Sequence, residues 1–163
     1  MSFTELRGAR PSFKIVADTI ESENLTITGD WTFSGDVSIT GDITANNLVS
    51  GTYTPTLAIV ANLDATTAFE CQYMRVGNVV TVSGQFNADA TTTNTDTSMT
   101  MTLPVASTFT TGEQLGGVFS AYRPVAHGTV GKVTASGSLA GLQWYPISTI
   151  NQAYSFTFTY QII

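Results

Sequence analysis

A six-residue repeat near the start of the chain constrains its fold more than any other feature. Three consecutive units, LTITGD, WTFSGD and VSITGD, begin at Leu25, Trp31 and Val37, and the pattern fades after Ile43. Each unit places two apolar side chains two positions apart and then a Gly-Asp pair, which predicts short strands bent at fixed intervals with one apolar face. Burial of so few side chains cannot offset the conformational entropy lost on ordering the segment. The repeat therefore predicts a structure that forms only in an oligomer.

We expect residues 25–50 to form a short intertwined β-helix or β-prism shaft built by three chains. The apolar positions expected to face the trimer axis are Leu25, Ile27, Trp31, Phe33, Val37, Ile39 and Ile43. Asp30, Asp36 and Asp42 recur at one position of the repeat, so symmetric copies would stack carboxylates in rings, which can hold a cation. A Gly-Asp pair is also a common turn, in which the Asp side chain accepts hydrogen bonds from local backbone donors. We favour the turn interpretation and assign no metal.

Low charge and abundant Thr, Ser, Gly and Asn favour β-structure with neutral polar faces. Charged residues are 11% of the 163-residue chain, well below the roughly 25% of typical soluble domains. The net charge of −6 disfavours nucleic acid as a partner, because phosphate binding requires a basic surface. No apolar run has the length of a membrane span, and the first residues lack the basic start and apolar centre of a secretory signal. We expect a protein made in a cytoplasm, without membrane insertion.

The first 24 residues are not periodic, and they combine basic with apolar side chains. One interpretation is a disordered tail, and the other is an arm that docks on another protein, which we favour because two Phe and several aliphatic residues are unusual in a solvated tail. The residues expected to make this attachment are Phe3, Leu6, Arg7, Arg10, Phe13 and Lys14. From residue 15 to residue 70 the chain has acidic residues and no Lys or Arg. A basic arm thus precedes an acidic shaft.

Residues 51–163 read as an all-β domain with short alternating runs divided by turn signals, which suggests a jelly-roll-like β-sandwich. Gly77-Asn78 is the clearest hairpin signal, and the run from Tyr154 to Ile162 alternates strictly, so its four aromatic residues should be buried. The expected strands are 52–60, 68–76, 79–86, 98–103, 115–122, 128–135, 139–145 and 154–162. The domain should therefore contain about eight strands.

Titratable groups that could converge on a catalytic site are scarce. Cys71 and His127 are the single cysteine and histidine, and none of the familiar nucleophile, zinc-protease or phosphate-loop motifs is present. Alternation places Cys71 on one face with Phe69 and Tyr73, which favours a small buried hydrophobe over a nucleophile paired with His127. A hexapeptide acyltransferase also has six-residue units, but with one inward aliphatic residue per unit and many coils. We therefore expect no enzymatic activity and no cofactor.

Aromatic residues near loops offer one alternative binding site. Trp144 and Tyr145, next to Pro146, are the best exposed candidates for stacking on a sugar ring, and Tyr122 is the second. The competing interpretation, which we favour, is that these residues finish strands and pack between subunits.

The chain as a whole resembles trimeric tailed-bacteriophage fibres and head-decoration proteins. The units LTITGD and VSITGD resemble their shaft segments, and GTYTPTL from Gly51 together with CQYMRVGNVVTVS from Cys71 resembles the β-sandwich knob often fused to such shafts. The resemblance covers residues 25–163, while the preceding arm matches no pattern. It implies a homotrimeric structural protein on the surface of a virion, without enzymatic activity. Together with the residue patterns described above, we expect an attachment arm at 1–24, a trimerisation shaft at 25–50 and a knob at 51–163.

Two functions follow from this resemblance. The first is a capsid decoration (cement) or head-fibre protein whose arm docks on the major capsid protein. The second is a receptor-binding tail-fibre tip whose knob recognises a host-surface glycan. The single short shaft and single knob favour the first, because tail fibres commonly carry a longer anchor and shaft.

Overall fold

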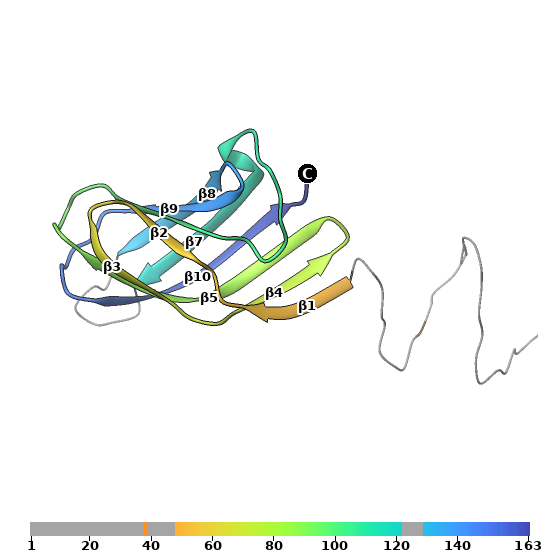
Figure 1. Ribbon diagram of the computed structural model, residues 1–163, viewed down its shortest axis with the longest axis horizontal. Helices are drawn as coiled ribbons and strands as arrows, with labels where there is room; N and C mark the ends of the chain where they lie inside the picture. The colour runs from red at the N-terminus through yellow and green to blue at the C-terminus, as the bar shows by residue number, and fades with distance from the viewer. Residues whose placement is uncertain (1–37, 39–47, 122–128) are drawn as a thin grey trace, which may run out of the picture. The chain divides into compact units, whose positions relative to one another are not determined.

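The computed structural model describes Ser38, residues 48–121 and residues 129–163 (Figure 1). The chain divides into two units, Met1–Ile39 and Thr40–Ile163. All described residues except Ser38 lie in the second unit.

The described part of the chain is built from ten strands and one short 3-10 helix, and the expected all-β class is confirmed. Within residues 48–121 and 129–163 no helix has the length and hydropathy required to cross a membrane. The elements are β1 (Leu48–Tyr53), β2 (Leu57–Ala61), β3 (Leu63–Ala68), β4 (Cys71–Val76), β5 (Val79–Ala90), β6 (Thr97–Met101), η1 (Gly112–Gln114), β7 (Leu115–Ala121), β8 (Val130–Ser136), β9 (Leu139–Trp144) and β10 (Gln152–Gln161).

All strands belong to one antiparallel sheet that curls around a single core (Figure 1). The order is β1-β4-β5-β10-β7-β8-β9-β6-β2, and β3 pairs with β5 off this path. The long strand β5 pairs with β4 along Val79–Ser83 and with β3 along Phe86–Ala90. Because β3 also contacts β2, the last strand of the path, that end of the sheet curls back towards β5 and the sheet folds over its own apolar face.

Asn62 makes the corner between β2 and β3. It adopts a left-handed backbone with φ of 57°, which Asn tolerates better than most residues. Its side-chain amide donates to the carbonyl of Thr92 at 2.8 Å and to the hydroxyl of Thr97 at 2.6 Å, and its carbonyl oxygen accepts from the Thr91 hydroxyl. These bonds fasten the corner to the chain around β6.

The central strand β10 supplies much of the core. Tyr154, Phe156, Phe158 and Tyr160 are all buried, as the strict alternation of this segment predicts. The outward positions between them are Ser and Thr, so one face packs and the other remains polar. Strand β10 pairs with β5 over ten residues and with β7 over seven, which fixes the middle of the sheet.

Aromatic rings from four strands meet in the curl. The ring of Phe86 on β5 stacks on Tyr154 with centroids 5.1 Å apart, and Phe119 on β7 meets Trp144 on β9 edge to face at 5.2 Å. Trp144 also lies 5.6 Å from Tyr154. Offset and edge-to-face pairs of this kind are the favoured ring geometries. The cluster joins strands that are far apart along the path of the sheet.

About eight strands were expected and ten are observed, while the six runs expected from 79–86 onward correspond to β5 to β10 with limits that differ by at most four residues. The strand expected over 52–60 is wrong: Pro55, which lacks a backbone donor, lies between two strands, β1 and β2. Strand β3 was not expected, and the run expected over 68–76 begins only at Cys71. The boundary predicted at residue 51 falls inside β1, which pairs with β4 from Leu48 onward. The Gly77-Asn78 hairpin is confirmed, with Gly77 at a φ of 60°.

The antiparallel strands give the domain two ends. The near end holds the start of β1 at Leu48, the Gly77-Asn78 turn and the C-terminal Ile163, where the backbone of Ile162 donates to the Asn78 carbonyl at 2.7 Å (Figure 1). The far end holds the loop from Thr91 to Asp96 and the loop from Tyr145 to Asn151. The two ends present different chemistry, as described below.

Adjacent glycines in β7 provide a stringent test of the packing. A Cβ on Gly117 would collide with the Thr157 carbonyl oxygen and with Phe158, whereas a Cβ on Gly116 would enter open space. We expect Gly117→Ala to lower the free energy of unfolding by about 1–3 kcal/mol, and Gly116→Ala to leave it almost unchanged. Urea denaturation followed by circular dichroism measures both. Equal stabilities of the two variants would contradict the assigned inward face of β7.

The buried phenol of Tyr160 predicts a loss of stability at high pH. It donates to the Val105 carbonyl at 2.6 Å, and burial raises its pKa to about 12. The pKa of a tyrosine in the unfolded chain is about 10, so the native state holds this proton more tightly than the unfolded chain. The stabilisation is therefore complete below about pH 10 and is lost as pH rises from about 10 towards 12. Burial also raises the pKa of Tyr53 and Tyr154, which act in the same direction.

Urea denaturation at a series of pH values should show the free energy of unfolding falling above about pH 10. Tyr160→Phe should make that fall less steep, and should cost about 1 kcal/mol at neutral pH through the lost hydrogen bond. A Tyr160→Phe profile parallel to that of the parent would show that this phenol does not control the alkaline transition.

Candidate functional site

The outward face of β1, β4, the first half of β5, β10 and β7 is free of charged side chains. Its rows carry hydroxyls, amides and a few apolar groups, and neighbouring strands are linked by side-chain hydrogen bonds. The hydroxyls of Thr81 and Thr159 lie 3.2 Å apart, and the Gln85 amide donates to the Ser155 hydroxyl at 3.2 Å. Glu70 borders this face and accepts from the Thr52 hydroxyl at 3.2 Å. We call this surface the neutral face.

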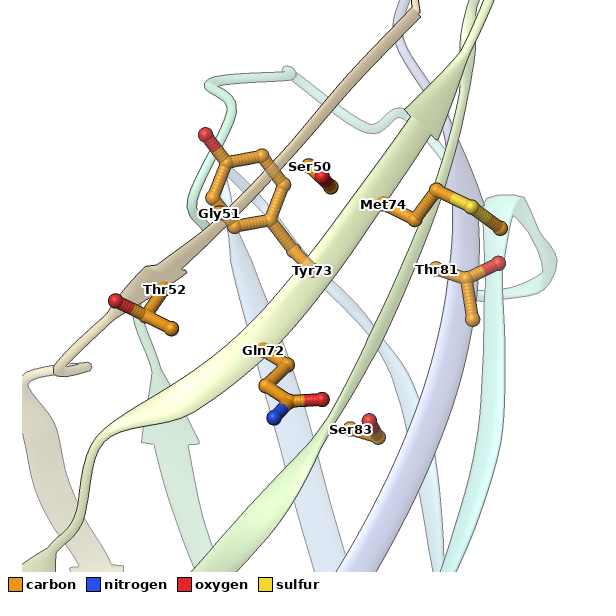
Figure 2. Close-up of a pocket in the computed structure, with 8 residues that line it drawn as sticks. All are labelled: Ser50, Gly51, Thr52, Gln72, Tyr73, Met74, Thr81 and Ser83. Carbon is orange, nitrogen blue, oxygen red and sulfur yellow. The ribbon is translucent and has the colours of Figure 1, made fainter. Parts of the chain in front are cut away.

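A shallow depression of about 480 Å³ lies on the neutral face where β1, β4 and β5 run side by side (Figure 2). Its outward side chains are Ser50, Thr52, Gln72, Met74, Thr81 and Ser83, and Gly51 and Tyr73 complete the lining. The Tyr73 ring lies against Gly51, because a Cβ at position 51 would come within 3.1 Å of it. Two further depressions continue along the same face. The second shares Gln72 and Ser83 with the first, and the third shares Ser155 and Phe156 with the second.

This arrangement suits contact with another surface better than chemistry on a small molecule. The outward groups are neutral donors and acceptors held in fixed rows, and no group of three or more His, Cys, Asp or Glu residues converges anywhere in the described ranges. The described part of the chain therefore offers packing area and hydrogen bonds. The composition predicted neutral polar faces in general but not which strands carry them, and the alternating Ser, Thr and Gln residues of β4, β5 and β10 were the signal for their position.

Trp144 was one candidate for stacking on a sugar ring, and its burial rules that role out; it finishes β9, as the favoured interpretation has it, but packs within its own chain. It ends β9 with its side chain turned inward, is 2% exposed and packs against Phe119 and Tyr154. Alternation turns the next residue outward, so Tyr145 is 62% exposed. Of the other candidates for this site, Tyr122 lies outside the described residues. The predicted pair is thus divided between the core and the surface.

Tyr145 opens an apolar loop at the far end. Ile147 and Ile150 in the same loop are also exposed. The loop is held by the backbone of Asn94, which donates to the Pro146 carbonyl at 2.7 Å. The neighbouring loop is rich in hydroxyls, since residues 91–95 are Thr-Thr-Thr-Asn-Thr. The far end therefore combines one exposed aromatic ring with neighbouring polar groups.

Buried polar atoms without partners also lie towards the far end. Among the described residues these atoms are the Thr129 hydroxyl, the Trp144 indole nitrogen, and the amide nitrogen and oxygen of Gln152. Gln152 begins β10 and Thr129 precedes β8, so both mark the same end of the sheet. Buried polar groups without hydrogen bonds are costly. This part of the core thus has hydrogen-bonding capacity that the described residues leave unused.

Cys71 is buried at the start of β4, as the alternation of its segment predicts. Its thiol lies 3.2 Å from the Phe69 carbonyl oxygen, and burial raises its pKa, which disfavours the reactive thiolate. His127, its hypothetical partner, lies outside the described residues. A Cys71 nucleophile therefore has no support in the geometry.

The other predicted site residues fall outside the described ranges, so the structure neither supports nor opposes them. They are the attachment residues Phe3, Leu6, Arg7, Arg10, Phe13 and Lys14, the shaft core residues Leu25, Ile27, Trp31, Phe33, Val37, Ile39 and Ile43, and the repeated residues Asp30, Asp36 and Asp42.

Comparison of the chain with protein-family models, with curated proteins and with solved structures finds no match.

Proposed function

We propose that this chain is a structural protein of a virus particle, a homotrimeric capsid decoration or head-fibre protein that docks on the major capsid protein through its N-terminal arm. The proposal includes the shaft intertwined from three chains and a jelly-roll-like sandwich as the finer description of the knob. It also places the protein on the particle surface, after synthesis in the host cytoplasm. No enzymatic activity, cofactor, nucleic acid or membrane insertion forms part of it.

The observation that carries the proposal is the junction at Leu48. A hexad segment predicted to need copies of itself leads, within a few residues of the sequence, into an all-β domain with a broad neutral face. A neutral face of fixed hydroxyls and amides can pack against a protein surface without burying unpaired charge. This combination fits a particle component whose work is adhesion and assembly.

Three arms on one trimer explain how a short segment could hold the particle. A single arm would lose its conformational entropy on docking and bind weakly. The second and third contacts of a trimer are intramolecular, and avidity of this kind strengthens binding by about 10² to 10⁴. We therefore expect the receiving capsid surface to repeat around a local three-fold axis.

Removal of residues 1–20 tests the attachment. Capsids assembled without this protein are mixed with the intact trimer or the truncated trimer, and occupancy is measured by electron microscopy. We expect truncation to lower occupancy by at least about 100-fold at limiting concentration, while sedimentation velocity still shows a trimer. As a milder variant, Arg7→Glu with Arg10→Glu should also reduce occupancy. Equal occupancy of intact and truncated trimers would reject arm-mediated docking.

Tyr145 supports a second candidate function, a receptor-binding tail-fibre tip. It is an exposed aromatic ring at the far end, away from the point where the chain enters the domain at Leu48. A fibre presents such an outer end to the host cell, and an aromatic ring beside hydroxyl-rich loops is suited to stacking on a sugar.

A paired substitution separates this candidate from the first. If the far end binds a host-surface glycan, Tyr145→Ala should weaken binding of the full-length protein to host cells or an immobilised glycan panel by about tenfold. Tyr145→Phe should retain most binding, because the stacking ring remains. Undiminished binding by Tyr145→Ala would exclude this ring as the contact.

A further inference from the structure

Four exposed apolar side chains gather on the neutral face at the near end. Leu48 pairs with Val76 across β1 and β4, and Val76 pairs with Val79 across β4 and β5, so these three lie in one cross-strand row. Met74 lies two residues along β4, next to this row. Each of the four side chains is between 40% and 53% exposed. We call Leu48, Met74, Val76 and Val79 the entry patch.

No charged side chain interrupts the entry patch. The sequences of β1 and β4 contain one charged residue, Arg75, whose neighbours in the cross-strand pairing are Val49 and the buried Val80. Arg75 thus lies on the opposite face of the sheet, and its guanidinium donates to the Gly77 carbonyl at 2.8 Å. The patch continues into Ser50 and Thr81, which are neutral. An apolar centre with a neutral polar border resembles the core and rim of a protein interface.

The position of the patch in the chain indicates what covers it. Leu48 is the first residue of the sheet and follows Ile43, the last apolar residue of the hexad pattern, by five positions. Five extended residues span at most about 18 Å. If three chains share a shaft, three entry patches must therefore begin close to its axis.

A three-fold axis also explains the neutrality of the patch. Near such an axis each side chain faces its own copies, so any charge would oppose the same charge twice. Apolar residues avoid this repulsion and are the ones that benefit from leaving water. A patch lacking charge, at the point where the chain enters the domain, is complementary to itself.

We propose that the entry patch is the surface through which the domains of three copies of this chain contact one another around the trimer axis. This inference rests on the proposed homotrimer and adds the contact that the second unit makes within it. Leu48, Val76 and Val79 form its centre, and Met74 packs at its border. The shaft then unites the three chains, and the entry patches bind the three domains to one another at its end.

The test uses the full-length protein and a matched pair of variants. Val76→Lys with Val79→Lys places two charges per chain in the patch. The control is Ile59→Lys with Val60→Lys, which changes side chains that are 45% and 63% exposed on β2, outside the neutral face. Far-UV circular dichroism verifies that both variants fold. Sedimentation velocity over a dilution series then gives the concentration at which each trimer dissociates.

We expect the patch variant to dissociate at a concentration at least about tenfold higher than the parent, and the control to behave as the parent does. A second measurement does not depend on the lysines. Val79→Cys places a thiol in the patch, and oxidation with copper phenanthroline should join two chains through a disulfide, seen as a dimer on a non-reducing gel. Val60→Cys, on the exposed β2, and the parent, whose Cys71 is buried, should give no such dimer.

The outcomes separate this inference from the proposed function. A parent protein that sediments as a monomer would reject the trimer, and this inference with it. A trimer whose stability is unchanged by the paired lysines, and whose Val79→Cys variant does not cross-link, would reject the inference alone. Residues 1–47 of the same chain are the alternative cover for the patch. If residues 1–47 cover the patch, the thiol introduced by Val79→Cys would be protected from a thiol reagent in dilute monomer, and no cross-linked dimer would form. This result would also overturn the inference.

Discussion

The structure depends on contact between aromatic rings that the curl of one sheet brings together. Phe86, Phe119, Trp144 and Tyr154 come from four different strands, and their centroids lie 5.1 to 6.3 Å apart in the pairs that form the cluster. A flat sheet would leave these rings exposed on one face. Because an antiparallel sheet can curl until its apolar face is enclosed, burial of the rings determines the curvature. The neutral face is formed by the alternate, outward-pointing residues of the same strands.

The curl divides the domain between its two ends. All strand pairs are antiparallel, so each strand begins or finishes at either the near end or the far end. The near end receives the chain at Leu48 and holds the tight Gly77-Asn78 turn, which keeps Val76 and Val79 directly opposite each other. The far end carries longer loops, with Tyr145 exposed and the Gln152 amide unpaired within the described residues. On the proposals made above, contact with copies of the chain lies at the near end, and receptor contact, in the second candidate function, lies at the far end.

The fold could be predicted from the sequence wherever a strand alternates cleanly. Strand β10 was predictable because apolar and hydroxyl residues alternate through it, and the Gly77-Asn78 hairpin because glycine tolerates a positive φ. Strand β3 was not predictable, because the segment Leu63-Asp-Ala-Thr-Thr-Ala68 has small and polar residues on both faces of the strand. It is held by pairing with β5. The single curled sheet was also beyond prediction, since it depends on β2 meeting β3 at the Asn62 corner, which is a property of tertiary contacts.

The candidate sites show the same limit at the level of single residues. Trp144 and Tyr145 are adjacent aromatic residues, and composition alone gives no reason to separate them, yet a one-residue step in a strand reverses the face. The phase of β9 against β6 and β8 decides which ring is buried. The entry patch is hidden from sequence reasoning for a related reason. Leu48 and Val79 are distant in the chain, and each looks like an ordinary strand residue.

Register alone places Leu48, Val76 and Val79 in one row, and the curl of the sheet places that row on the outside. In an isolated domain the same three residues would serve better as Thr or Ser, like most other outward residues of the neutral face. Their apolar character is therefore explained more simply by a surface that leaves water when copies assemble than by the stability of the single chain.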